Sequence, residues 1–342
     1  MADAVGMADA AGTAEAPGIA EAPGKARLAI VISGEGSNMA ALLYASRLAD
    51  CPYEVVLVAS NNPEAPGLRL AEAEGVPTFA RSHKGLGRGE FDALLDEALS
   101  AVRPDAVALA GYMRLLTPGF VQRWQGRLLN IHPSLLPKYR GLDTYARALE
   151  AGDLHAGCTV HLVTEEVDAG EILGQVAVTI QPDDTVETLA ARVRLAEHQL
   201  YPRVLATYLS RHQDAHWIEQ QVDVLARALP EVLRKSNHGA PGWAVGSEKT
   251  AKHFAILADR HHGSDAIGLL LRSSGADEMT GLIEAQPDLY FWPKYYGASG
   301  WLGLTLNRPD TDWEQVRDWL QRSWQASAPA RLTRLVRIAD DF

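Results

Sequence analysis

Short, almost entirely apolar runs alternate with helical stretches over the first half of the chain, and this alternation limits the fold more than any other feature. The first two runs are LAIVIS at 28–33 and YEVVLVAS at 53–60. Similar runs follow at VPTFAR (76–81), DAVALAGY (105–112) and LLNIH (128–132). Strands that are apolar on both faces are typical of parallel sheets covered by helices on both sides. The pattern therefore predicts an α/β fold with a mainly parallel sheet.

Two further apolar runs extend this sheet. They are GCTVHLVTEE (157–166) and ILGQVAVTI (172–180), and a short acidic link containing glycine joins them. Such a pair predicts two antiparallel strands at the sheet edge. A long helix is then expected from Asp184 to about Leu209.

The pattern changes after Ser210, which indicates a second domain. The polar segment RHQDAHW is followed by an amphipathic stretch, expected to be a helix over 218–234. Short strand candidates and a closing helical stretch predict an α+β domain. We therefore predict one domain over 26–213 and another over 214–342. Residues 1–25 lack a periodic apolar face, so we expect a disordered tail.

Composition excludes several classes of function. The formal net charge is −11, from 43 acidic and 32 basic side chains. This charge disfavours non-specific electrostatic binding to nucleic acid or to an anionic membrane. No apolar run approaches the ~20 residues of a membrane span. The two cysteines, Cys51 and Cys158, match no metal-ligand spacing, and the chain is too large to need a disulfide staple. We expect a cytoplasmic monomer or homodimer that needs no metal.

The loop after the first strand is a candidate anion site. SGEGSN (33–38) joins that strand to the first helix, where free backbone N–H groups and the helix dipole attract phosphate. The loop lacks both the full dinucleotide fingerprint and the lysine of a P-loop. From the residues alone, a phosphate site and an ordinary turn remain equally open.

Asn130 and His132 are candidate catalytic residues. They are two apart in a strand, so both side chains leave the same face, at the carboxyl end where ligands bind in open α/β sheets. An Asn amide can donate to a developing oxyanion, and a neighbouring His can act as a general acid or base. The alternative is a polar pair that caps the strand.

Two carboxylates have less certain roles. Asp168 lies among three acids in EEVDAG (165–170), which on composition alone are solvated turn residues. Glu197 falls on the apolar stripe of the long helix, and a buried carboxylate is costly without a partner. That partner is a substrate amine, the nearby His198, or an arginine in a structural ion pair.

Five motifs, in order, identify a family. They are SGEGSN (33–38), LAGYMRLLTPGFV (109–121), NIHPSLLPKYRGL (130–142), GCTVHLVTEEVDAGEILGQ (157–175) and ARVRLAEHQLYP (191–202). Through them, residues 27–210 resemble the phosphoribosylglycinamide formyltransferases. The resemblance implies a Rossmann-like formyltransferase fold.

The resemblance also implies roles for individual residues. The catalytic group comprises Asn130, His132 and Asp168. Contacts to the substrate phosphate fall on Gly36, Ser37, Asn38 and Arg88, and Glu197 lies near the substrate amine. The residues around the folate pterin are Arg114, Leu115, Val163, Thr164, Glu165, Glu166, Val167 and Asp168.

The implied reaction transfers a formyl group from 10-formyltetrahydrofolate to the amine of glycinamide ribonucleotide. Asn130 and protonated His132 would stabilise the oxyanion, while Asp168 would pair with the imidazole and relay a proton through water. Formyltetrahydrofolate deformylases and methionyl-tRNA formyltransferases share this centre and are the alternatives. The chain departs from the family pattern at Asp143 and Tyr145, where histidines are usual, so details of substrate contact stay open.

The second half resembles the MmcQ/YjbR-like family over 216–342. The resemblance is carried by IEQQVDVLARALPEV (218–232), DLYFWPKYYGASGWLGLTL (288–306) and APARL (328–332). It implies no activity. One hypothesis is that this half is a regulatory or partner-binding module.

Overall fold

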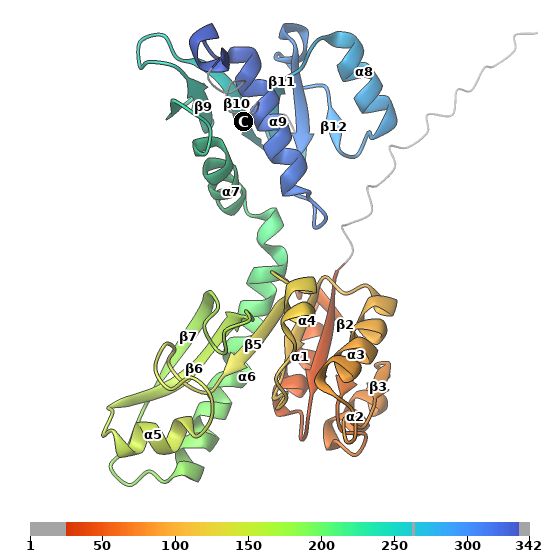
Figure 1. Cartoon of the computed structure of the whole chain (residues 1–342), viewed down its shortest axis with the longest axis vertical. Helices are drawn as coiled ribbons and strands as arrows, with labels where there is room; N and C mark the ends of the chain where they lie inside the picture. The colour runs from red at the N-terminus through yellow and green to blue at the C-terminus, as the bar shows by residue number, and fades with distance from the viewer. Residues whose placement is uncertain (1–24, 262–263, 335–342) are drawn as a thin grey trace, which may run out of the picture.

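The computed structural model describes residues 25–261 and 264–334, so nearly all of the tail expected over 1–25 lies outside the described residues. The chain forms two sheets, each with its own helices (Figure 1). The long helix α6 (Val186–Ser210) runs from the first group of elements towards the second. Among the described residues, no helix is both long and apolar enough to cross a membrane.

The first sheet confirms the expected α/β architecture. Its seven strands are ordered β3-β2-β1-β4-β5-β6-β7. Strands β1 to β5 pair in parallel, whereas β6 and β7 pair antiparallel at one edge, as the sequence predicted. Their bounds are β1 (Ala26–Ile32), β2 (Tyr53–Ser60), β3 (Thr78–Ala80), β4 (Ala106–Leu109), β5 (Leu128–His132), β6 (His155–Leu162) and β7 (Ile172–Thr179).

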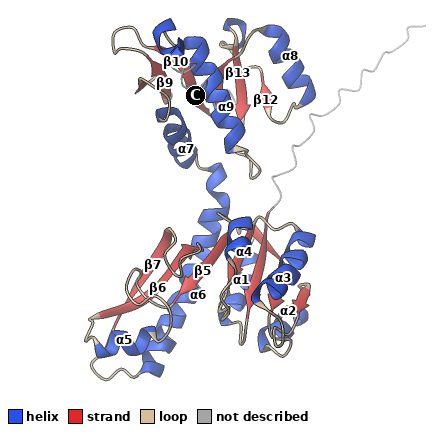
Figure 2. Ribbon diagram, viewed as in Figure 1, coloured by secondary structure: helices blue, strands red, loops and turns tan. Residues whose placement is uncertain are grey.

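Helices cover both faces of this sheet (Figure 2). One buried cluster joins the strands to α1 (Ser37–Ser46), α2 (Pro66–Ala73) and α6. A second cluster, on the other face, joins them to α3 (Arg88–Val102) and α4 (Pro118–Arg123). Burial on both faces explains why the central strands read as continuous apolar runs.

The strand order creates a crevice. The chain passes from β1 to β2 and β3 on one side and returns to β4 and β5 on the other, so the order reverses between β1 and β4. At such a switch point the loops after the two strands diverge and leave a crevice at the carboxyl edge. The loops after β1, β4 and β5 all end at this edge.

Tyr201 fixes α6 against this part of the sheet. Its fully buried hydroxyl lies 3.2 Å from the carbonyl oxygen of Leu109 and 3.1 Å from that of Leu129. These carbonyls belong to neighbouring strands, β4 and β5. The contact therefore fixes the position of α6 relative to β4 and β5.

The second sheet is antiparallel, which confirms the expected α+β class. Its order is β12-β13-β11-β10-β9-β8. The helices α7 (Ala215–Arg227) and α9 (Trp313–Ser327) share a buried cluster with it. The remaining bounds are β8 (Val232–Arg234), β9 (Gly242–Val245), β10 (Lys252–Asp259), β11 (Ile267–Arg272), α8 (Ala276–Ala285), β12 (Tyr290–Phe291) and β13 (Trp301–Thr305).

One predicted element is wrong in extent. The helix expected over 218–234 ends at Arg227, and its last three residues instead form β8. Pro230 explains the difference, because a proline disfavours helical geometry in the residue before it and lacks an N–H. The predicted domain boundary at 213/214 falls between the single turn η1 (Arg211–Gln213) and α7, and it remains a prediction.

Candidate active site

The loop after β1 has the geometry of an anion site. Gly36 precedes α1 with φ of 73°, a left-handed conformation that favours glycine. A Cβ at Gly36 would also lie 3.1 Å from the Cα of Gly67. Ser33 ties this loop to the loop after β4, because its hydroxyl oxygen accepts a hydrogen bond of 2.9 Å from the N–H of Met113. The two loops that border the crevice are therefore connected.

Asn38 and Glu197 form a buried pair beside this loop. The Asn38 amide donates a 2.7 Å hydrogen bond to the Glu197 carboxylate, and both residues are more than nine-tenths buried. The structure thus supplies a partner that the sequence did not indicate, in place of His198 or an arginine. Burial raises the pKa of Glu197, and the Asn38 hydrogen bond and the Arg194 charge oppose that rise only in part. The carbonyl oxygen of the Asn38 amide is buried without a partner among the described residues.

We expect Glu197→Gln to stabilise the protein while weakening its binding of substrate. Glutamine removes a buried charge, and its amide can donate to the unpaired Asn38 oxygen. A gain of about 1 kcal/mol would raise Tm by roughly 2–4 °C at neutral pH, measurable by calorimetry. Because the resemblance places Glu197 near the substrate amine, we also expect KM to rise about tenfold as one charge-assisted contact is lost.

The pH dependence of this gain follows from the direction of the shift. Because the folded-state pKa of Glu197 is raised, wild-type stability declines as the pH rises through that pKa. The glutamine variant lacks this decline, so its advantage should be largest at neutral pH and shrink in acid. The exposed Glu150→Gln is the matched control. A constant advantage at every pH would show that Glu197 does not titrate as described.

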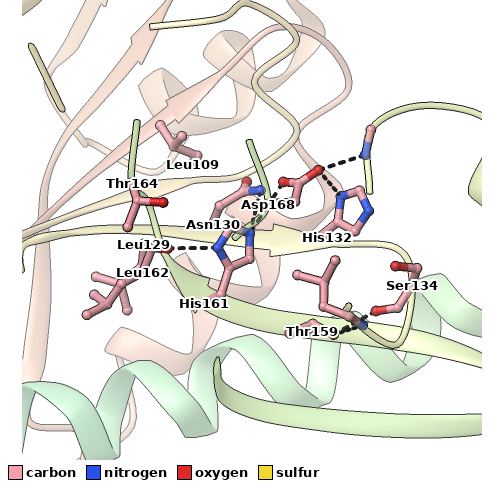
Figure 3. Close-up of polar contacts among 12 residues, drawn as sticks. Leu109, Leu129, Asn130, His132, Ser134, Thr159, His161, Leu162, Thr164 and Asp168 are labelled. Atoms are coloured by element: carbon pink, nitrogen blue, oxygen red, sulfur yellow. Dashed lines mark hydrogen bonds and ion pairs between the residues drawn. The ribbon is translucent and has the colours of Figure 1, made fainter. Parts of the chain in front are cut away.

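Asn130, His132 and Asp168 meet on one face of β5 (Figure 3). Asn130 and His132 leave the same face of the strand, while Leu129 and Ile131 pack into the cluster beneath α6. The loop between β6 and β7 folds over this face. It brings the Asp168 carboxylate to 3.3 Å from His132 Nδ1, where the carboxylate also accepts a 2.9 Å hydrogen bond from the N–H of Gly141.

Both ring nitrogens of His132 have a partner. Nε2–H donates a 2.9 Å hydrogen bond to the carbonyl of Tyr139, and Nδ1 faces Asp168. Burial lowers the pKa of His132, and the Tyr139 hydrogen bond and the Asp168 charge oppose that shift without cancelling it. For Asp168, burial alone would raise the pKa, but hydrogen bonds and the neighbouring imidazoles bring it below its usual value. The aspartate is therefore an anion that can stabilise a proton arriving on the ring.

His161 belongs to this group and was missed from the sequence. It is 2% exposed and lies opposite Asn130 in the β5–β6 pairing. Nδ1–H donates a 2.8 Å hydrogen bond to the carbonyl of Leu162, so a neutral ring can accept at Nε2 from the Asn130 amide, 3.3 Å away. A charged ring would instead direct Nε2–H towards Asp168, 3.5 Å away. In the neutral state, the second proton of the Asn130 amide remains free for another acceptor.

The turn that follows β5 is braced from β6. The buried Thr159 hydroxyl donates a 2.6 Å hydrogen bond to the carbonyl of Ser134 and accepts one of 3.1 Å from the N–H of Leu136. Thr159 lies opposite His132 in the strand pairing. The turn that carries Tyr139 and Gly141 is thereby held at a fixed position relative to the imidazole.

Gly170 determines the path of the loop that carries Asp168. A Cβ at this position would lie 1.8 Å from the carbonyl oxygen of Leu162, so any side chain forces the backbone to move. We expect Gly170→Ala to lower kcat on the order of 100-fold, because a displacement of about 1 Å is enough for such a loss. Gly119→Ala, where nothing lies within 4 Å, is the matched control. Full activity in Gly170→Ala would show that the position of Asp168 is not critical.

The residues expected around a pterin line the same region. Leu115 and Val167 are 53% and 47% exposed. The Arg114 guanidinium lies over the Phe91 ring, 5.3 Å from its centre. In the β6–β7 loop, the N–H of Val163 donates to the carbonyl of Leu128, the Thr164 hydroxyl donates to that of Glu166, and Glu165 is exposed. Glu166 also pairs with Arg140.

Three other residues have no contact with the catalytic group. Arg88 is the first residue of α3 and is exposed, without an ion pair among the described residues. Asp143 precedes α5 (Thr144–Glu150) with φ of 58° and makes no side-chain cap. Tyr145, on α5, is half-buried, and burial together with the Glu197 charge raises its pKa. The departure from the family pattern at Tyr145 is therefore close to the Asn38–Glu197 pair.

Comparison with known proteins identifies the first domain. The formyl transferase family model matches residues 26–205, more than half of the 342 residues. The chain belongs to the formyl transferase family. The phosphoribosylglycinamide formyltransferase of Haemophilus influenzae is 44% identical over 180 residues, which are 52% of this chain and 85% of that protein. The crystal structure of phosphoribosylglycinamide formyltransferase from Brucella melitensis is 49% identical with a TM-score of 0.52, covering 54% of this chain and 95% of that one.

Other relatives of this formyl transferase chain are much longer. The trifunctional purine biosynthetic protein adenosine-3 of Bos taurus is 47% identical over 182 residues. The match covers 53% of this chain and 18% of that protein, so the chain spans less than a fifth of the relative's length. A YjbR family model matches residues 227–326, which confirms the resemblance expected for the second half. The formyl transferase chain therefore carries a second, YjbR-like segment.

The described residues of this formyl transferase chain, 25–261 and 264–334, contain no group of three or more His, Cys, Asp or Glu side chains placed to hold a metal ion. Cys158 is fully buried, and burial raises the pKa of its thiol to about 12. The independence from metal that the sequence suggests remains a prediction.

Proposed function

We propose that the chain transfers the formyl group of 10-formyltetrahydrofolate to the primary amine of glycinamide ribonucleotide, a step in purine synthesis. The observation that carries the proposal is the convergence of Asn130, His132 and Asp168 at the end of β5, beside the crevice of a formyl transferase fold. The names of the matched relatives support the choice of substrate. We place the reaction in the cytoplasm, in a monomer or homodimer.

The strand order supports a bound pose for the ribonucleotide. Strand β4 separates β1 from β5, so the phosphate loop and the catalytic group are two strand spacings apart, about 10 Å. Phosphate and amine are at opposite ends of glycinamide ribonucleotide. With the phosphate on the N–H groups of Gly36, Ser37 and Asn38, the amine reaches the end of β5.

Glu197 then faces the middle of the substrate. Its partner Asn38 belongs to the phosphate loop, and no contact among the described residues joins Glu197 to the catalytic group. The nearest donors on the ribonucleotide are its ribose hydroxyls, with the amine further along. Arg88, at the start of α3, is a further phosphate contact if the loop before it closes over the crevice.

The chemistry follows from the catalytic group. The amine lone pair attacks the formyl carbon, a C–N bond forms, and the carbonyl electrons move to oxygen. The free proton of the Asn130 amide and the Nε2–H of His132 are donors for this oxyanion, and His132 releases Tyr139 as it turns to the substrate. Collapse breaks the bond to N10 of the folate. The amine proton passes through water and Asp168 to N10, which leaves formylated ribonucleotide and tetrahydrofolate.

The folate lies on the other side of the catalytic group. We propose that the backbone of Arg114 and Leu115 and the loop from Val163 to Asp168 hold the pterin. A bound ring system would bury the exposed apolar side chains of Leu115 and Val167. Removing this apolar surface from water would favour binding.

The test is formyl transfer by the purified full chain, with free formate measured in parallel. We expect 10-formyltetrahydrofolate to be consumed only when glycinamide ribonucleotide is present, with one formylated product per folate released. Formate release without an acceptor would contradict the proposal and assign the chain to the deformylases. Absence of both reactions would refute any formyl-folate activity.

A further inference from the structure

A cavity of about 630 Å³ lies where α6 leaves the first sheet and α7 begins. Its volume is within the range of small-molecule sites. One wall comes from the C-terminal half of α6 and the adjoining edge strands, and the other from Trp217 and Gln221 on α7. Among the described residues, its lining includes none of the candidate active-site residues. It is therefore a separate cavity, and both halves of the chain form it.

The cavity carries more positive than negative charge. Arg203, on α6, and Arg211, the residue that follows α6, both line it, and Glu171 is the acid that lines it. Neither arginine has an ion pair within residues 25–261 and 264–334. In a chain with a formal net charge of −11, a local excess of cationic groups favours an anionic occupant.

Arg211 lies against two aromatic rings. Its guanidinium carbon lies 3.5 Å from the centre of the Tyr208 ring and 5.2 Å from that of Trp217. The Tyr208 hydroxyl is itself held, because it donates a hydrogen bond to the carbonyl of Gly126. Stacking occupies the flat faces of a guanidinium and leaves the N–H groups at its edge free. Those N–H groups match the oxygens of a phosphate.

Hydrogen bonds brace the junction between the two walls of the cavity. Gln213 exchanges two hydrogen bonds with Asn307, of 3.1 Å and 3.2 Å, and its carbonyl accepts a third, of 2.8 Å, from Arg260. These contacts tie the turn between α6 and α7 to the second sheet. A preformed site avoids the entropic cost of ordering its walls on binding.

The other lining groups define the rest of the ligand. Leu173 and Trp217 are half-buried and offer apolar surface, and Gln221 and Glu171 offer an amide and a carboxylate. Leu200 and Val204 also line the cavity but are almost wholly buried. We propose that this cavity binds a nucleoside monophosphate. Its phosphate binds Arg211 and Arg203, its base lies on the apolar side chains, and its hydroxyl or amino groups donate to Glu171 and Gln221. The proposal does not depend on the function assigned to the active site.

Isothermal titration of the full chain with adenosine 5′-monophosphate tests the proposal. We expect saturable binding that Arg203→Gln weakens about tenfold, since one charge-assisted phosphate contact is lost. Arg69→Gln is the matched control, because Arg69 is exposed on α2 and has no ion pair among the described residues. Adenosine and inorganic phosphate, titrated alone, should each bind at least tenfold more weakly. Saturating glycinamide ribonucleotide should leave the binding unchanged.

Four results would overturn the proposal. They are no binding at millimolar nucleotide, equal affinities in the Arg203 and Arg69 variants, displacement by glycinamide ribonucleotide, and phosphate binding as tight as that of the nucleotide. Arg203 is exposed and its side chain takes part in no packing contact described above, so misfolding is not expected to obscure the result. Circular dichroism of each variant verifies this.

Discussion

His132→Ala should lower kcat for formyl transfer by roughly 1000-fold, within the range for loss of a general acid or base. The imidazole is buried between the Tyr139 carbonyl and the Asp168 carboxylate, which hold the ring in place. Asp168→Asn should cost nearly as much, since an amide cannot stabilise a proton arriving on Nδ1. Single-turnover kinetics at saturating substrates measure both losses directly.

A double variant separates the pairing of Asp168 with His132 from the proton relay proposed for Asp168. If Asp168 works only through His132, the double variant His132→Ala/Asp168→Asn should be hardly slower than His132→Ala alone. Losses that multiply in the double variant would show that Asp168 acts on the substrate independently. Lys138→Ala provides a control, because its exposed side chain pairs with Asp153 and not with His132 or Asp168.

Much of the first domain follows from its sequence. The run LLNIH coincides with β5. Asn130 and His132 lie together because side chains two positions apart in a strand leave the same face. The antiparallel pair at the sheet edge also follows, since the link between its apolar runs is too short for a crossover. Local pattern is sufficient wherever the interacting residues are close in the chain.

Contacts between distant segments could not be predicted in this way. Asn38 and Glu197 are 159 positions apart, and only the packing of α6 beside α1 brings them together. His161 was missed because its role depends on the register between β5 and β6. Alternation shows that its side chain shares a face with others of β6, but not which residue of β5 lies opposite. The signal was a second polar side chain, two positions after Thr159, on the same face of a largely apolar run.

The second half shows a different limit. Helix α8 was not expected, and β8 was taken as part of a helix. Pro230 is the local signal that was missed before β8, and both segments are short enough for their periodicity to be weak. The cavity beside Arg211 depends on how the two halves meet, which no periodicity within either half can reveal.

Asn130→Ala should lower kcat by roughly 100-fold or more and leave both KM values nearly unchanged. Its amide is proposed to meet the oxygen only when negative charge develops there, and an interaction made only in the transition state appears in kcat and not in binding. Steady-state kinetics with each substrate varied in turn separates these quantities.

Asn130→Asp distinguishes an oxyanion donor from a spacer of the same shape. Aspartate keeps the size and the place opposite His161 but presents a negative charge to the developing oxyanion, so it should be slower than alanine. If aspartate instead retained most of the activity, or if alanine raised KM for the folate with kcat intact, Asn130 would be a ground-state binding residue. The transition-state charge would then have to be stabilised by His132 alone.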